Sequence, residues 1–153
     1  WSARSSSTRT SITKRFGARA MMLLDTSVLV PLFRDKTGRR RDRFRRFVGG
    51  ADYMLSRLTE IELLQGCASE RQWEELADYL DVQDYVEMSP SSWGDAARTL
   101  FDLRHKGLTV RSILDCCIAQ LAIEHRLTLI HDDRDFETIA KVRALRHHRF
   151  QLQ

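Results

Sequence analysis

Carboxylates follow two apolar segments of the chain, where they could share one site. Asp25 comes directly after the apolar run MMLL, and Asp132 and Asp133 come after LTLIH. In open α/β sheets, ligand sites form outside the carboxyl ends of the strands. If the two segments are neighbouring strands, their terminal acids face one pocket. Each acid taken singly could instead cap a helix or lie in a solvated turn.

A third carboxylate, Asp115, lies within the apolar helical pattern SILDCCIAQLA. A carboxylate beside a core face needs a partner, which can be a helix cap, an arginine or a cation. Arg111 stands one helical turn earlier and could pair with it. The alternative is that Asp115 faces the same pocket as Asp25.

A fourth carboxylate has two candidates in the stretch SRLTEIELLQG, Glu60 and Glu62. On a helix these side chains are about 200° apart, so they cannot serve the same site. Gly66 lies four residues after Glu62 and shares its face. A glycine inside a helix costs about 1 kcal/mol relative to alanine, which indicates a packing or access reason for it. We therefore expect Glu62 in the pocket, and Glu60 pointing outward or supporting the helix start.

The elements that must position these acids alternate along the chain. Predicted strands cover 21–25, 52–56, 84–88 and 127–131, with a possible edge strand at HHRFQL near the end. Predicted helices cover 26–33, 39–49, 57–68, 70–80, 91–105, 112–126 and a short segment from about 135. Helices between strands imply right-handed crossovers and a mostly parallel sheet covered on both faces. We find no internal repeat, so residues 21–153 are predicted to form one α/β domain.

The charge of the chain is concentrated at its beginning. Five of the 25 Lys and Arg residues lie within residues 1–20, which contain no acid. The remaining 133 residues carry 20 basic and 21 acidic side chains, a net charge of −1. Residues 1–20 are rich in Ser and Arg without apolar periodicity, so we expect a disordered basic extension outside the fold. Their composition is also that of an organelle transit peptide. We favour an upstream segment that precedes a true start at Met21 or Met22.

Other bulk features narrow the class of protein. The chain has 153 residues, of which 42% are hydrophobic and 30% charged, a globular balance. No apolar run reaches the length of a membrane span. Three cysteines, two of them adjacent in a helical pattern, fit buried thiols in a reducing compartment better than a disulfide framework. We expect a cytoplasmic protein with no membrane partner.

The motifs DTSV, ELLQG, DCCIAQLA and HDDRDF, in this order and spacing, resemble the PIN-domain ribonucleases, and in particular the VapC-type toxins of bacterial toxin–antitoxin pairs. The resemblance covers roughly residues 21–140. Carried over residue by residue, the four acids of the family fall on Asp25, Glu62, Asp115 and Asp133, with Asp135 as a supporting acid. The implied fold is a three-layer α/β/α sandwich with a central, mostly parallel sheet of four to five strands. The chain departs from the family at His131, where many members have Thr or Ser.

The resemblance implies a Mg²⁺-dependent endoribonuclease, in which Mn²⁺ can substitute, that leaves a 5′-phosphate and a 3′-hydroxyl. Clustered carboxylates cannot all ionise close together without a cation, and hard oxygen ligands select these metals. In that reading Asp25 and Asp115 are primary ligands, while Glu62 and Asp133 bind a second ion or hold and deprotonate the water. Thr26 or Ser27 orients a ligand or a bound water.

Basic side chains near an acidic site are needed to attract RNA. The segment 34–46 holds eight Lys and Arg residues. We expect RNA or antitoxin contact from Arg39, Arg40, Arg43 and Arg111, although a solvated helix face would explain some of them.

The implied partners are an RNA substrate and a VapB-type antitoxin. The RNA could be transfer, ribosomal or messenger RNA, and its cleavage would inhibit translation and growth. The family also implies a homodimer, and a heterotetramer or larger assembly with antitoxin. The main alternative is a catalytically inactive PIN-like domain that binds RNA or a partner protein.

Overall fold

A computed structural model describes residues 21–151 of the chain. The expectation of a basic extension at residues 1–20 lies outside these described residues. Within them, no helix combines the length and apolar composition that a membrane crossing requires.

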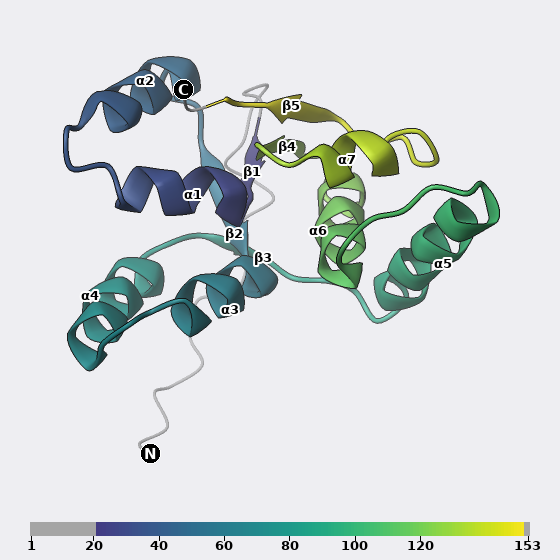
Figure 1. Ribbon diagram of the computed structural model, residues 1–153, viewed down its shortest axis with the longest axis horizontal. Coiled ribbons are helices and arrows are strands. Elements are labelled where there is room, and N and C mark those ends of the chain that lie inside the picture. The colour runs from purple at the N-terminus through teal and green to yellow at the C-terminus, as the bar shows by residue number, and fades with distance from the viewer. Residues whose placement is uncertain (1–20, 152–153) are drawn as a thin grey trace.

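A five-stranded sheet forms the middle layer (Figure 1). Its spatial order is β3-β2-β1-β4-β5, and all four neighbouring pairs are parallel. The strands are β1 (Met22–Leu24), β2 (Tyr53–Ser56), β3 (Tyr85–Val86), β4 (Thr128–His131) and β5 (His147–Arg149). The predicted parallel sheet is confirmed, and the possible edge strand near the chain end is β5.

Seven helices of the described chain connect the strands, and each predicted helix is present with ends shifted by at most a few residues. They are α1 (Thr26–Phe33), α2 (Arg39–Val48), α3 (Arg57–Gln65), α4 (Glu70–Asp81), α5 (Ser92–His105), α6 (Ile113–Glu124) and α7 (Arg134–Ile139).

The helices bury both faces of the sheet because successive strand residues point to opposite sides. Leu23 and Leu129 belong to the apolar cluster formed with α5, α6 and α7. Leu24 and Ile130, the next residues along, belong to the cluster formed with α1, α2, α3 and α4. Two cores on two faces make the predicted three-layer α/β/α architecture.

The strand order places a crevice between β1 and β4. The chain moves outward from β1 to β2 and β3, then returns to the other side of β1 to form β4. Right-handed crossovers put the helices of the outward path on one face and those of the return path on the other. At such a reversal the two helix layers diverge beyond the strand ends, which is where ligands bind in open parallel sheets. Asp25 and Asp133 follow these two strands.

Asp35, which our sequence reasoning did not single out, organises the turn that leads into α2. Its carboxylate accepts hydrogen bonds from the Thr37 backbone N and Oγ1 at 3.0 and 2.8 Å, and from the backbone N of Arg40 and Arg41 at 2.9 and 3.2 Å. Burial acts to raise the pKa of Asp35, but these hydrogen bonds outweigh it and lower the pKa to about 2.

Replacing Asp35 should therefore remove pH-dependent stability. Because its folded pKa lies below the unfolded value, ionised Asp35 stabilises the fold above about pH 4, and this contribution is lost as the pH falls toward 2. Asp35→Asn should be clearly less stable than wild type in urea unfolding at pH 7, and the gap should close near pH 2. Asp42→Asn, an exposed acid on α2, is the control with little effect. A gap that is constant with pH would contradict this role.

Candidate active site

A cleft of about 520 Å³ opens beyond the ends of β1 and β4, and all four acids selected from the sequence line it. Asp25 precedes α1, Glu62 comes from α3, Asp115 from the first turn of α6, and Asp133 precedes α7. The other lining residues are Thr26, Ser27, Val30, Pro31, Arg111 and Ser112. Segments more than a hundred residues apart in sequence thus place four carboxylates around one hollow.

Asp25 is almost fully buried, with 4% of its surface exposed. It is the N-cap of α1, and one oxygen, Oδ2, accepts hydrogen bonds from the Ser27 backbone N at 2.9 Å and Oγ at 2.5 Å. The Ser27 hydroxyl also accepts from the backbone N of Asp132 at 2.9 Å, which ties the ends of β1 and β4 together. Burial raises the pKa of Asp25; the Ser27 hydrogen bonds oppose this, and the charges of Glu62 and Asp133 add to it.

Glu62 lies in the cleft and Glu60 does not, as the sequence argument expected. Glu62 accepts a hydrogen bond from Thr26 Oγ1 at 3.0 Å, whereas Glu60 pairs with Arg57 at 2.6 Å. The reason given for that choice was wrong. Gly66 is not inside the helix, because α3 ends at Gln65 and Gly66 is its C-cap.

Asp115 is half-buried, and within residues 21–151 no hydrogen bond or ion pair reaches its carboxylate. The cap of α6 is Ser112, and the expected alternative pairing with Arg111 does not form. Burial and the charges of Asp25 and Asp133 raise the pKa of Asp115 to about 7. Of the three partners named for this carboxylate, two are therefore ruled out in the described chain, and a cation is left.

Arg111 pairs with two other acids. Its guanidinium contacts Asp133 Oδ2 through Nη2 and Asp135 Oδ2 through Nε, the latter at 3.0 Å, and its backbone N also donates to Asp135. Asp133 caps α7 through its other oxygen, Oδ1, which accepts from the backbone N of Asp135 at 3.0 Å. Asp133 lines the cleft, and the nearly buried Asp135 stands behind it and holds Arg111.

His131, where the chain departs from the family pattern, is fully buried at the end of β4. Its Nδ1 accepts a hydrogen bond from the backbone N of Asp133 at 3.2 Å, and its Nε2 lies 2.9 Å from Nδ1 of His147. Burial and the neighbouring His147 lower the pKa of His131 to about 4, so the ring is neutral at pH 7. A ring nitrogen here accepts the bond that a Ser or Thr hydroxyl can accept in such a turn.

The donor set fits a hard divalent cation, although the side chains do not enclose one as they stand. No group of three or more His, Cys, Asp or Glu side chains in the described part of the chain is already arranged to hold a metal ion. The fit is chemical. The lining acids supply only oxygen donors, two of them have raised pKa values, and one has no partner within residues 21–151. A cation would relieve the repulsion between these groups.

Of the predicted basic contacts, only Arg111 lines the cleft. Arg39, Arg40 and Arg43 are exposed on α2 outside its lining. The guanidinium of Arg43 lies over the Phe150 ring at 5.5 Å.

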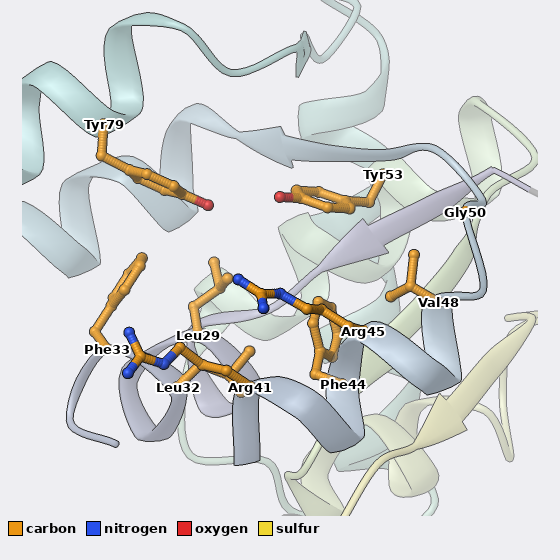
Figure 2. A pocket seen from close by; sticks show the side chains of 10 residues that line it. All are labelled: Leu29, Leu32, Phe33, Arg41, Phe44, Arg45, Val48, Gly50, Tyr53 and Tyr79. Carbon is orange, nitrogen blue, oxygen red and sulfur yellow. The ribbon is translucent and has the colours of Figure 1, made fainter. Parts of the chain in front are cut away.

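Sequence reasoning missed an apolar groove of about 640 Å³ between α1, α2 and α4. Figure 2 shows Phe33 and Tyr79 next to each other at one end of this groove, where their ring centroids lie 5.2 Å apart. The Tyr79 and Tyr53 hydroxyls point toward each other, and the Arg41 and Arg45 guanidiniums reach over the groove. The remaining lining residues are Leu29, Leu32, Phe44, Val48 and Gly50. The sequence shows most of these residues as apolar positions of single helices. The groove itself exists only because of how the three helices pack.

Fold and cleft together define a parallel α/β domain with four carboxylates in the crevice between β1 and β4, where the strand order reverses. The PIN domain family model matches residues 22–142 of the chain. The chain belongs to the PIN domain family.

The relatives and structural neighbours agree with this assignment. VapC ribonuclease Mb1587 of Mycobacterium bovis is 32% identical over 133 residues, which cover 82% of this chain and 96% of the relative. Ribonuclease VapC51 of Mycobacterium tuberculosis is 31% identical over 120 residues, covering 78% and 85%. The VapBC2 structure from Rickettsia felis, bound to a promoter DNA fragment, matches with a TM-score of 0.69 at 17% identity, covering 86% of this chain and 99% of that one. The resemblance to VapC-type proteins is confirmed.

The unpartnered carboxylate of Asp115 leads to a prediction about metal-free stability. Asp115→Asn should raise the melting temperature in EDTA by a few degrees, because it removes a charge repelled by its neighbours, and about 1 kcal/mol corresponds to roughly 2–4 °C at this size. Mn²⁺ should raise the melting temperature of wild type and have little effect on the variant.

Differential scanning fluorimetry with EDTA or Mn²⁺ measures both shifts. Asp78→Asn, an exposed acid on α4, is the matched control and should respond to Mn²⁺ as wild type does. A variant that melts earlier than wild type in EDTA would show that Asp115 has a structural role instead.

Proposed function

We propose that this protein is a Mg²⁺- or Mn²⁺-dependent endoribonuclease that acts as the toxin of a toxin–antitoxin pair. The observation that carries the proposal is Asp115, a half-buried carboxylate with no partner among residues 21–151, in a cleft shared with three other acids. The ribonuclease names of its relatives and the VapBC neighbours support the reaction class.

In this proposal the residues of the cleft have two roles in hydrolysis, metal binding and activation of the attacking water. A divalent ion in the cleft would neutralise charge on a phosphate and lower the pKa of a water. Asp25 and Asp115 would hold the ion. Because Ser27 binds Oδ2 of Asp25, the other oxygen of Asp25 would contact the ion. Glu62, oriented by Thr26, and Asp133 would bind a second ion or accept the proton of the attacking water.

Arg111 supplies positive charge beside the carboxylates, and its side chain is 72% exposed. We infer that Arg111 would exchange its contact with Asp133 for one with the RNA backbone, where an arginine can bind phosphate with two hydrogen bonds. The exposed arginines of α2 would add non-specific attraction that weakens with salt.

The apolar groove fits an antitoxin segment. Phe33 and Tyr79 line both this groove and a second hollow, which also contains Glu62 and Val30. Glu62 and Val30 in turn line the carboxylate cleft, so the second hollow adjoins both the groove and the cleft. We propose that a VapB-type antitoxin lays apolar side chains into the groove, with acidic residues beside Arg41 and Arg45, and extends toward the carboxylates.

Purified protein free of antitoxin should cut total bacterial RNA into discrete fragments in Mg²⁺ or Mn²⁺ and leave it intact in EDTA. Asp25→Asn and Glu62→Gln should each lower the initial rate by more than about a hundredfold, since even partners that only orient metal ligands account for 10–100-fold. Gel or sequencing-based fragment mapping measures both the rate and the cut sites.

Glu60→Gln is the matched control, because Glu60 stands two residues from Glu62 and pairs outside the cleft. It should cut at the wild-type rate. Folded wild-type protein that leaves RNA intact in both metals would favour the alternative, an inactive PIN-like domain that binds RNA or a partner.

Arg111→Gln should separate metal binding from RNA cleavage. Removing the guanidinium frees Asp133 from its ion pair, so Mn²⁺ should bind several-fold more tightly, while the cleavage rate should fall about tenfold or more because the phosphate contact is lost. Calorimetric titration with Mn²⁺ and the RNA assay measure the two effects. Arg104→Gln, an exposed arginine on α5, is the control. If Mn²⁺ affinity falls instead, Arg111 is a scaffold for Asp133 and does not compete with the metal.

A further inference from the structure

Two side chains on the same side of the edge strand β5 contact the end of β4 and the acidic turn that follows it. His147 lies next to the ring of His131, and Arg149 pairs with Asp132, its Nε donating to Oδ1 at 2.9 Å. The backbone of β5 pairs with β4 in register, with His131 opposite Arg149. The backbone N of Phe150 also donates to the carbonyl oxygen of His131 at 2.7 Å.

The hydrogen bonds define which ring nitrogens carry protons. The Asp133 backbone N–H donates to Nδ1 of His131, so this nitrogen is unprotonated. In a neutral ring the proton is then on Nε2, which donates to Nδ1 of His147 at 2.9 Å. His147 is therefore an acceptor at Nδ1, and it sets the orientation of the His131 ring.

Arg149 acts on the same turn from its other end. It holds the Asp132 side chain, and the Asp132 backbone N–H donates to the Ser27 hydroxyl, which in turn donates to Asp25. The β5 side chains thus reach two of the four cleft acids, Asp133 through His131 and Asp25 through Asp132 and Ser27, without lining the cleft themselves.

We propose that His131, His147 and Arg149 are positioning residues, through which the edge strand β5 holds the carboxylates of the cleft in place for metal binding. The proposal rests on the proposed function. Partners that orient metal ligands in this way typically account for 10–100-fold in metal affinity.

His148 provides a matched control on the same strand. It lies between His147 and Arg149 and points to the opposite side of the strand. Its ring stacks on Phe47, with ring centroids 4.9 Å apart. His148→Leu removes a histidine of β5 without touching the turn after β4.

The experiment compares His147→Leu, which removes the acceptor, with His147→Asn, whose amide oxygen can take the place of Nδ1. His147→Leu should weaken Mn²⁺ binding by about 10–100-fold in calorimetric titration. It should also speed hydrogen exchange at the Asp133 amide and change the ring ¹⁵N signals of His131. His147→Asn should stay within a few-fold of wild type, and His148→Leu should match wild type in all three measurements.

Wild-type Mn²⁺ affinity and wild-type exchange at the Asp133 amide in His147→Leu would overturn the proposal. An equal loss of Mn²⁺ affinity in His148→Leu would also overturn it. If His147→Leu does not fold, His131→Asn, which keeps an acceptor for the Asp133 amide, is compared with His131→Leu. Only His131→Leu should lose Mn²⁺ binding. If wild type binds no Mn²⁺, the proposed function fails, whereas the exchange and ¹⁵N measurements still decide whether β5 fixes the turn.

Discussion

Electrostatic repulsion within the cleft is the constraint on which the rest of the structure depends. The ends of β1 and β4 and the helices α3 and α6 bring four acids together: Asp25, Glu62, Asp115 and Asp133. Like charges in a partly buried space oppose this arrangement. Much of the surrounding hydrogen bonding offsets that cost. Hydrogen bonds orient two of the acids, Asp25 through Ser27 and Glu62 through Thr26. An ion pair with Arg111 neutralises Asp133. Asp115 alone has no such support in the described chain, and this is the observation behind the proposed cation.

Two of the acids are structural and functional candidates at once. Asp25 uses one carboxylate oxygen to start α1, and Asp133 uses one to start α7. A carboxylate has two oxygens, so capping a helix leaves the second for another partner, which for Asp133 is Arg111. Helix capping and metal binding, which stood as rival explanations of these residues in the sequence, are compatible. The helix start also fixes the direction of each acid, because the capping bond determines where the second oxygen lies.

The sequence predicted what depends on local pattern and strand order. Alternating segments gave the strands, the helices and the parallel sheet, and the position of Asp25 and Asp133 after two strands gave the cleft. What the sequence left open depended on contacts that local spacing cannot show. Arg111 was considered a partner of Asp115 by helical spacing, but α6 begins at Ile113, so that spacing does not apply, and Arg111 turns toward α7. The histidine pair and the apolar groove needed the tertiary packing of distant segments.

In the proposed function, an antitoxin gains affinity in the apolar groove and inhibits at the carboxylates, and one hollow adjoins both places. A chain held in the groove by its apolar side chains presents its far end to the cleft as an intramolecular ligand, at an effective concentration that can reach the millimolar range. That far end needs almost no affinity of its own. In that arrangement the far end can vary in sequence at little cost and leaves the cleft once the groove contact is released. The proposed control of the site then lies in an anchor that does not touch the reacting groups.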